Sequence, residues 1–409
     1  MSESTFIPFN RPSIGEEEIN EVIATLRSGW LTTGPRTAQF EQDFQAYVGA
    51  RHALAVNSCT AGLHLALAAL RIGPGDEVIT TPLTFCATIN VILHLGAVPV
   101  LADVGAAGNI DPASVAERIT DRTRALIPVH LAGLPCEMDA IWRLAQQHRL
   151  HVVEDAAHAV GTYYRGQPIG AADPGTGTCS SAVAFSFYAT KNLTTGEGGM
   201  VTTHDESLAE MMRILCLHGI SKDAWNRYAD RGNWYYDVQV PGFKYNLSDI
   251  QSAIGLHQLR KLDRFIEIRT HFAQMYHRAL ADVAEVELPP SGGATCRNSW
   301  HLYMLALKLE RLEIDRAEFI RALRRRNIGT SVHFIPVPLH PFFAQYAGRP
   351  ENQCPRALAL YPRLVSLPLY PALCEEQIEY VAASVKEIVS HARKTKMISV
   401  AGWSVESGS

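Results

Sequence analysis

Short apolar segments alternate with helical segments between residues 76 and 206, and this alternation constrains the fold more than any other feature. The apolar segments expected to form strands are Glu77–Thr81, Pro99–Asp103, Ala125–His130 and His151–Asp155. The helical segments between them, in which apolar residues recur with helical spacing, are 84–95, 111–120 and 138–148. This pattern predicts an α/β fold with a mostly parallel sheet that is covered by helices on both faces.

Polar and aromatic residues gather where the expected strands end. They are Ser58, Phe85, His130, Asp155, Ser186 and Lys191. Ligands bind at the carboxyl ends of the strands in open α/β sheets. The coincidence therefore indicates that several of these residues belong to one site.

Lys191 follows the strand expected at 182–186 and precedes a glycine turn at 196–199. Its neighbours are aromatic, small or hydroxyl residues, which do little to stabilise an ammonium group. Desolvation should therefore lower the pKa of Lys191 and leave more of it as the nucleophilic amine that Schiff-base chemistry requires. The alternative is a lysine at a strand end whose ammonium reaches solvent.

Two further positions suit an aromatic, phosphorylated cofactor. Asp155 would be a buried carboxylate that needs a cationic partner, which a pyridinium nitrogen supplies, unless it only caps the following turn. The helix that opens with Ser58, Cys59 and Thr60 would turn free backbone N–H groups toward a phosphate. The alternative there is a plain hydroxyl cap.

Three more side chains complete a pocket for pyridoxal 5'-phosphate (PLP). Phe85 offers a flat surface on which the ring can stack, and Ser186 offers a hydroxyl to the phosphate. His158 is near enough in sequence to reach the ring face or its 3-hydroxyl. With Lys191 as the imine-forming amine and Asp155 as the nitrogen partner, the expected cofactor is PLP.

Five motifs in a fixed order carry a specific resemblance. They are Gly29-Trp-Leu-Thr-Thr-Gly-Pro, Gly75-Asp-Glu-Val-Ile-Thr, Glu154-Asp-Ala-Ala-His-Ala-Val-Gly-Thr, Phe185-Ser-Phe-Tyr-Ala-Thr-Lys-Asn-Leu and Gly242-Phe-Lys-Tyr-Asn-Leu-Ser-Asp-Ile. From about residue 8 to 390 the chain resembles the DegT/StrS family of PLP-dependent sugar aminotransferases. Its motifs are most similar to the branch of UDP-4-amino-4-deoxy-L-arabinose aminotransferase-like enzymes.

The resemblance implies the aspartate aminotransferase-like fold type I, and a homodimer with active sites at the interface. The expected parts are a large PLP-binding domain over 10–250, a long linking helix with a small C-terminal α+β domain over 251–393, and a flexible tail over 394–409. In the small domain we expect strands at 300–309 and 329–334. Helices are expected at 315–326, 354–361 and 374–392.

The resemblance also assigns roles by position in the motifs. Lys191 and Asp155 are the catalytic residues, as Schiff-base lysine and partner of the pyridine nitrogen. The residues implied to bind the cofactor are Cys59, Thr60, Phe85, Asp155, His158, Ser186, Lys191 and, from the neighbouring subunit, Asn246. The chain departs from the family at position 59, where Gly or Ala is usual, at position 158, where Gln is usual, and in a longer stretch at 171–181.

Three residues are expected on the substrate side. Trp30 and Thr32 lie in the 27–36 loop, where a large aromatic beside hydroxyls suits a sugar or base, although such a loop can also be only a turn. His333 stands where the family has a histidine near the substrate, the alternative being a packed strand histidine. The excursion at 221–240 should also shape specificity.

The implied reaction is a ping-pong transamination. An amino donor, expected to be L-glutamate, gives its amino group to the cofactor with Lys191 as general base and acid. A keto sugar of a nucleotide sugar, expected to react at C4 rather than C3, then takes that group. The product would serve the synthesis of surface polysaccharide or of secondary-metabolite sugars.

Three other functions are weighed against this one. The nearest is a PLP-dependent nucleotide-sugar dehydratase, but the related dehydratases replace the lysine with histidine. A Rossmann oxidoreductase is disfavoured because no GxGxxG follows the first strand. A non-catalytic regulator on the same fold would be expected to have lost Lys191 or Asp155.

Composition limits the partners. A net charge of -4 over 409 residues gives no argument for nucleic acid or an anionic membrane as partner. The eight cysteines are scattered singly, which predicts reduced thiols rather than disulfides or a metal site. No signal peptide or apolar segment of spanning length is found, so we expect a cytoplasmic protein.

Overall fold

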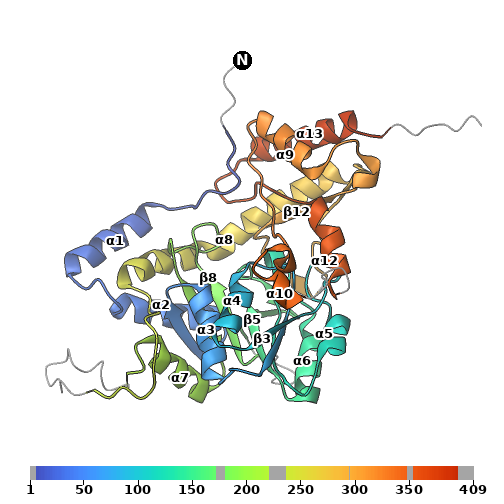
Figure 1. The fold of residues 1–409 in the computed structure, drawn as a ribbon. Helices are drawn as coiled ribbons and strands as arrows, with labels where there is room; N and C mark the ends of the chain where they lie inside the picture. Colours follow the sequence, from blue (N-terminus) through green and yellow to red (C-terminus); the bar gives the residue numbers. More distant parts are fainter. Residues whose placement is uncertain (1–5, 172–179, 221–235, 294, 348–352, 395–409) are drawn as a thin grey trace, which may run out of the picture.

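The computed structural model describes residues 6–171, 180–220, 236–293, 295–347 and 353–394. Most of the longer stretch at 171–181, most of the 221–240 excursion and the tail beyond 394 therefore lie outside the described residues. Within the described part, a seven-stranded sheet forms the centre of the molecule (Figure 1).

The central sheet is mostly parallel, as predicted. Its strands in spatial order are β1 (His52–Val56), β9 (Gly199–Thr203), β8 (Ala182–Ser186), β5 (His151–Asp155), β4 (Thr123–Ile127), β2 (Glu77–Thr80) and β3 (Val98–Leu101). β9 runs antiparallel to β1 and β8, whereas the other neighbouring strands pair in parallel. The carboxyl ends of the parallel strands therefore lie at one edge, together with the beginning of β9.

Both faces of the sheet are covered because its residues alternate between two cores. Leu54 and Val56 lie in one core, whereas Ala53 and Ala55 lie in the other, as the twofold period of a strand requires. The helices of the first face are α3 (Cys59–Ala69), α4 (Ala87–His94) and α7 (Glu206–Cys216). Those of the second are α2 (Pro35–Val48), α5 (Pro112–Arg118), α6 (Met138–His148) and α8 (Asp249–Leu280).

The 32-residue helix α8 leads out of this layer to the C-terminal part of the chain (Figure 1). It begins at a capping box, in which Ser248 Oγ accepts from the backbone N–H of Gln251 and Gln251 Oε1 accepts from that of Ser248. Its second half packs into a separate core through Phe272, Tyr276 and Leu280.

That second core surrounds a small antiparallel sheet. Its elements are β10 (Val286–Glu287), β12 (Tyr303–Leu307), β13 (Leu364–Leu367), α9 (Arg316–Arg325) and α13 (Glu375–His391). Alternate residues of β12 serve two cores, since Tyr303 and Leu305 point into the small one while Met304 packs with Leu83 of the first layer. The edge of the small unit thus lies directly against the carboxyl end of the central sheet.

The prediction of a strand at 329–334 is wrong, because these residues form no strand in the structure. Only isolated bridges form there, between Ile7 and Ile328 and between Ser331 and Ser366, and β13 takes the place beside β12 instead. The prolines at 336 and 338 follow at once and lack the N–H groups that a continued ladder needs. His333 therefore lies on irregular chain.

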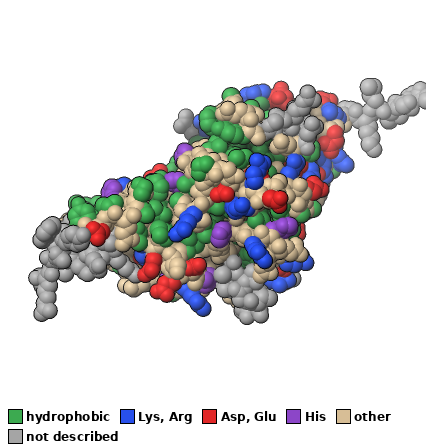
Figure 2. All heavy atoms as spheres, turned by 60° about the horizontal axis from the view of Figure 1, so that its bottom comes forward, with side chains coloured by type: hydrophobic (Ala, Val, Ile, Leu, Met, Phe, Trp, Pro, Cys, Tyr) green, Lys and Arg blue, Asp and Glu red, His purple; other side chains and the backbone are tan. Residues whose placement is uncertain are grey.

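The remaining elements are peripheral. They are α1 (Glu16–Ser28), the small sheet of β6 (Tyr163–Tyr164), β7 (Gln167–Pro168) and β11 (Cys296–Arg297), and the short helices α10 (Ala344–Ala347) and α12 (Pro355–Leu360). Acidic and basic side chains are interspersed over the face drawn in Figure 2.

Three expectations concern disulfides, metal ligands and membrane spans. The seven cysteines among the described residues are free thiols. No cluster of potential metal ligands occurs in the described part of the chain. Over the same ranges, no helix combines the length and the apolar character needed to cross a membrane.

Candidate active site

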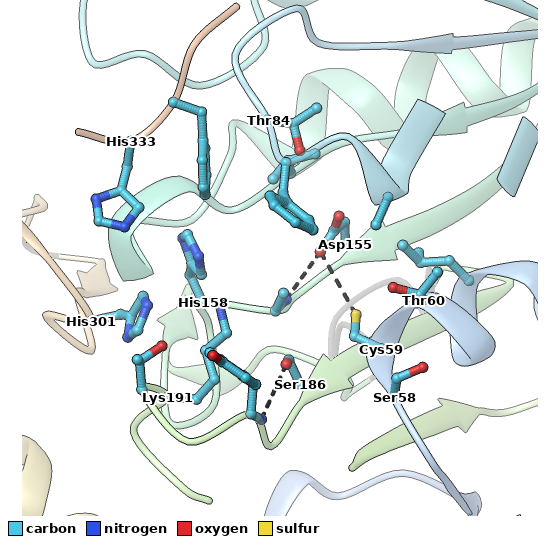
Figure 3. A pocket seen from close by; sticks show the side chains of 18 of the residues that line it. Ser58, Cys59, Thr60, Thr84, Asp155, His158, Ser186, Lys191, His301 and His333 are labelled. Atoms are coloured by element: carbon cyan, nitrogen blue, oxygen red, sulfur yellow. Dashed lines mark hydrogen bonds between the residues drawn. The ribbon is translucent and has the colours of Figure 1, made fainter. Parts of the chain in front are cut away.

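A cavity of about 500 Å³ opens at the carboxyl edge of the central sheet (Figure 3). Most of the predicted site residues line it. These are Cys59, Thr60, Phe85, Asp155, His158, Ser186, Lys191 and His333. The structure thus brings together side chains that are up to 274 positions apart in the chain, between Cys59 and His333.

Asp155 ends β5 at the floor of the cavity and is 5% exposed. Its Oδ2 accepts a hydrogen bond from Thr88 Oγ1 at 2.8 Å, and its Oδ1 accepts one from the backbone N–H of Ala157 at 3.1 Å. No described lysine, arginine or histidine forms an ion pair with it, and burial raises the pKa of the Asp155 carboxyl. The cavity therefore presents an acid that lacks a cationic partner.

His130, another residue at a strand end, does not belong to the cavity. Its Nε2 lies 2.7 Å from Glu154 Oε2, and its Nδ1 accepts from the backbone N–H of Cys136. The ring is fully buried by these contacts. His130 therefore serves the packing of β4 and β5 rather than the site.

The beginning of α3 forms the opposite end of the cavity. Ser58 Oγ accepts from the backbone N–H of Ala61 at 3.1 Å, so the hydroxyl cap is real. Helix geometry leaves the N–H groups of Cys59 and Thr60 without partners inside the helix, where the positive end of the dipole lies. The same turn can therefore carry the hydroxyl cap of Ser58 and still bind an anion through its free N–H groups.

Ser186 reaches the same end because β8 pairs with β9. Ser186 lies opposite Gly199 in the register, and a Cβ built on Gly199 would stand 2.7 Å from the backbone nitrogen of Cys59. Only glycine allows such a close approach of β9 to the start of α3. The hydroxyl of Ser186 and the first turn of α3 are thereby held side by side.

Lys191 follows β8 on an irregular turn and extends into the cavity (Figure 3). Burial lowers its pKa to about 8, and electrostatic interactions with Cys59 and Asp155 oppose this shift. Desolvation disfavours the ammonium form, so near neutral pH a larger share of Lys191 is the neutral amine than in an ordinary lysine. This agrees with the nucleophilic lysine expected from the sequence.

The lowered pKa of Lys191 predicts a pH dependence of its reactivity. In the protein freed of cofactor, the rate of acylation of Lys191 should rise with pH and reach half its maximum near pH 8, because only the deprotonated amine reacts. Peptide mapping by mass spectrometry after brief labelling at a series of pH values measures this rate. A partly exposed lysine in the same sample, Lys308, is the internal control, and a profile for Lys191 that matches it would contradict the prediction.

His158 is buried beside Lys191 and is expected to be neutral. Its Nδ1 accepts from the backbone N–H of Ala132 at 3.3 Å, and desolvation, aided by Lys191 and His333, places its pKa well below the usual range. A neutral imidazole that accepts through Nδ1 carries its proton on Nε2. His158 can therefore donate one hydrogen bond from Nε2.

Phe85 and Phe334 stand at the mouth of the cavity. Phe85 is 61% exposed and its ring centroid lies 6.1 Å from that of Phe334, which stacks in turn on His158 at 5.7 Å. His333, next in the chain, has Nδ1 2.8 Å from Ser366 Oγ, and burial lowers its pKa to about 4. An aromatic platform and a neutral histidine thus border the entrance.

Three predicted residues do not line this cavity. Asn246 Nδ2 donates to Thr33 Oγ1 at 2.7 Å, Trp30 Nε1 donates to the carbonyl of Thr33, and the carbonyl of Thr32 accepts from the N–H of Asp249. They form a second group in which the 30–33 loop meets the residues just before α8. In a single chain this group is separate from the cavity.

The sequence did not reveal several residues that line or support the cavity. His301 lies in it because the strand expected at 300–309 begins only at Tyr303, and Thr88 holds Asp155 from the first turn of α4. Asn192, beside Lys191, bonds to the carbonyl of Ser299. A signal for His301 was the polar run Asn298–His301 at the start of an apolar segment.

The residues present fit PLP. The buried carboxylate of Asp155 lacks the cation that a protonated pyridine supplies. The first turn of α3 and Ser186 suit a phosphate, and Lys191 is an amine with a lowered pKa within the same cavity. The same cavity therefore contains residues suited to the ring nitrogen, the phosphate and the aldehyde of the cofactor.

Comparisons with known proteins agree with this geometry. SpsC of Bacillus subtilis (strain 168), described as a spore coat polysaccharide biosynthesis protein, is 50% identical over 389 residues, or 95% of this chain and 98% of that protein. Spr1654 of Streptococcus pneumoniae, solved in a PLP form, is 32% identical with a TM-score of 0.86 over 94% of this chain and 99% of that one. DesV of S. venezuelae is 38% identical with a TM-score of 0.81 over 91% and 94%.

The family comparison covers nearly the whole length. Residues 12–386 match the DegT/DnrJ/EryC1/StrS aminotransferase family. The predictions of family, of fold type I and of PLP as the cofactor are thereby confirmed. The chain belongs to the DegT/DnrJ/EryC1/StrS family and is a PLP-dependent sugar aminotransferase.

Proposed function

We propose that this sugar aminotransferase moves the amino group of L-glutamate to the 4-keto carbon of a nucleotide sugar. The observation that supports the reaction is the cavity in which Lys191, with a pKa of about 8, faces the unpaired carboxylate of Asp155. The similarity to SpsC supports a product that enters a surface polysaccharide.

Bound PLP supplies an aldehyde carbon for an amine and a protonated ring that accepts electrons from it. Lys191 is the amine of this chain that forms the covalent link. Once freed, its neutral amine takes a proton from the α-carbon of the donor. In the second half of the reaction it delivers a proton to the sugar carbon that receives the amine. Its lowered pKa suits both directions of this transfer near neutral pH.

The other residues of the cavity hold and orient the cofactor. Asp155 keeps the proton on the ring nitrogen, while Thr88 and the N–H of Ala157 fix the carboxylate. Cys59, Thr60 and Ser186 hold the phosphate. His158, as an Nε2–H donor, suits the ring oxygen next to the reacting carbon, and Phe85 covers the ring face.

Product analysis tests the substrate. The PLP-loaded protein with glutamate is given 4-keto and 3-keto sugars on UDP, dTDP and GDP, and products are identified by mass and NMR. We expect an amine at C4 of one of these sugars and 2-oxoglutarate in equal amount. Loss of water without amine would support the dehydratase, and an amine at C3 would contradict the 4-keto assignment.

We further propose a homodimer with shared active sites. Helix α1 supports it, because Glu18 and Thr25 are buried toward α8 whereas Ile19, Ile23 and Leu26 are 37–52% exposed. Glu18 is bound there by Lys261 at 2.8 Å. An apolar face left open in one chain is typical of a protein interface.

The second group of predicted residues belongs to this dimer proposal. Trp30, Thr32 and Asn246 lie outside the cavity of their own chain and close to the end of α1. We infer that they complete the cavity of the partner, with Asn246 at its phosphate and Trp30 and Thr32 toward its substrate. His333 would contact the same substrate from the first chain.

Mixing two inactive variants tests the sharing. Lys191→Ala and Asn246→Ala homodimers should each have little activity. After unfolding and refolding together in equal amounts, half of the dimers are mixed and hold one intact site each, so activity should return to about a quarter of the wild-type value. Refolding each variant alone is the control, and no gain on mixing would contradict a site shared between subunits.

The domain division and the location of the protein are also proposals. Separate cores support a PLP-binding domain over 10–250 and a small domain with its linking helix over 251–393. The linking helix α8 joins them, since its first half packs with the large domain and its second half with the small one. Unpaired thiols in the described part of the chain support the cytoplasm.

A further inference from the structure

Residues 298–301 form a buried polar segment where three parts of the molecule meet. Asn298, Ser299, Trp300 and His301 are at most 5% exposed. The segment enters β12 of the small sheet, lies against the cavity through His301, and runs beside α8.

The first contact of the segment is with the residue that follows Lys191. Asn192 Nδ2 donates to the carbonyl of Ser299 at 2.9 Å, and Asn192 Oδ1 lies 3.4 Å from His301 Nδ1. Because the amide nitrogen donates to Ser299, the amide oxygen is the acceptor, and His301 Nδ1 carries the proton. One side chain thus ties the turn of Lys191 to two points of the segment.

The second contact is with His158. The ring centroids of His158 and His301 are 4.3 Å apart, and Ser299 Oγ donates to the carbonyl of His158 at 3.2 Å. Ser299 Oγ also accepts from Thr162 Oγ1 at 2.9 Å. Both the ring and the backbone of His158 are therefore held by this segment. Figure 3 shows the rings of His158 and His301 next to each other.

The third contact anchors the segment itself. Arg269 of α8 is 2% exposed, and its Nη1 donates to the carbonyls of Trp300, His301 and Leu369. Within the described residues, no carboxylate forms an ion pair with this guanidinium. Because Arg269 donates hydrogen bonds to backbone carbonyls, it fixes the course of the chain at Trp300 and His301.

We propose that His301 is a positioning residue for the link between Lys191 and the cofactor. It fixes the side chain of Asn192 by a hydrogen bond and the ring of His158 by contact, and it keeps water from Lys191. The inference rests on the proposed role of Lys191. Hydrogen bonding on one side and ring contact on the other leave the imidazole one orientation. Loss of either tie should change the environment of Lys191 before it changes the fold.

The test uses the PLP-loaded protein and its visible absorption, which follows protonation of the link between Lys191 and the cofactor. The variants are His301→Ala, His301→Phe, Asn192→Ala and the double variant His301→Phe with Asn192→Ala. Each is titrated with pH without substrate. The wild-type link is first reduced with borohydride and mapped by mass spectrometry to Lys191.

We expect His301→Ala to raise the pH midpoint by about one unit, because water admitted to the cavity favours the charged form. His301→Phe keeps the ring volume but cannot bond to Asn192, so it and Asn192→Ala should each raise the midpoint by a similar amount. The double variant should show no further rise, because both changes break the same hydrogen bond. His301→Gln, which retains a donor, should restore part of the wild-type value.

Two outcomes would overturn the inference. A wild-type midpoint in His301→Phe would mean that the ring only fills space, and additive shifts in the double variant would mean that Asn192 and His301 act separately. His64→Phe is the matched control, since His64 is 6% exposed and lies outside the cavity, and its midpoint should be unchanged. A wild-type protein without a reducible link at Lys191 would instead refute the proposed function.

Discussion

Lys191→Ala should bind PLP without a covalent link and lose transamination by at least about 10⁴-fold, because the variant lacks both the linking amine and the base that moves the proton. In the wild-type protein the same amine is predisposed to both tasks by burial, which lowers its pKa to about 8. Product formation from glutamate and a keto sugar, followed by mass spectrometry, measures the loss.

Two variants make this result specific. Lys191→Arg keeps the positive charge but cannot form an imine, so it should be as inactive as the alanine variant. Lys308→Ala removes a partly exposed lysine after β12 and should keep wild-type activity. Transamination by Lys191→Ala within tenfold of the wild-type rate would refute the assignment of the lysine.

Asp155→Asn should change activity and stability in opposite directions. The amide cannot keep the ring nitrogen protonated, and loss of one partner of a buried ion pair predicts a fall of about 10³-fold in turnover. In the cofactor-free protein, however, Asp155 is a buried acid without a cation and its pKa is raised. Its ionisation destabilises that form, so the asparagine variant should unfold at a higher temperature.

The pH dependence of this stability difference follows from the sign of the shift. A carboxyl with a raised pKa in the folded state binds its proton more tightly there than in the unfolded chain. The destabilisation is therefore absent at pH values below the unfolded pKa, grows between the unfolded and the folded pKa, and is complete above the folded one. The advantage of Asp155→Asn without cofactor should be largest near neutral pH and vanish in acid.

Asp103 provides a matched control for this prediction. It is 3% exposed, but its carboxylate accepts from the backbone N–H groups of Val104, Arg356 and Ala357. Because the ionised form is fully bonded, Asp103→Asn should lower the stability of the cofactor-free protein. Equal changes in unfolding temperature in the two variants would contradict the claim that the Asp155 carboxylate lacks a cationic partner in the cofactor-free protein.

The cavity residues at strand ends could be predicted because chain direction alone places them. Asp155 and Ser186 are the last residues of β5 and β8, and apolar strand patterns locate such ends closely. The first turn of α3 follows β1 for the same reason. Local pattern and parallel topology thus suffice for the half of the site that holds the cofactor.

The rest depends on contacts between distant segments. His301 lies in the cavity because Asn192 and Arg269, from two other elements, bend the chain before β12. The proton position on His158 depends on a backbone N–H at residue 132. His333 was expected on a strand that the prolines after it prevent, and no pattern within residues 329–334 shows this.

The reversed strand β9 has a consequence for how the chain can be altered. Six strands end at the edge of the sheet where the cavity lies and β9 begins there with Gly199, so the turns at the other edge of the sheet take no part in the site. The turns at Asp121–Arg122 and at Arg149 lie there and are exposed. A reporter domain inserted at either turn should leave the cofactor site intact, whereas a single residue added between Thr195 and Gly199 should destroy it.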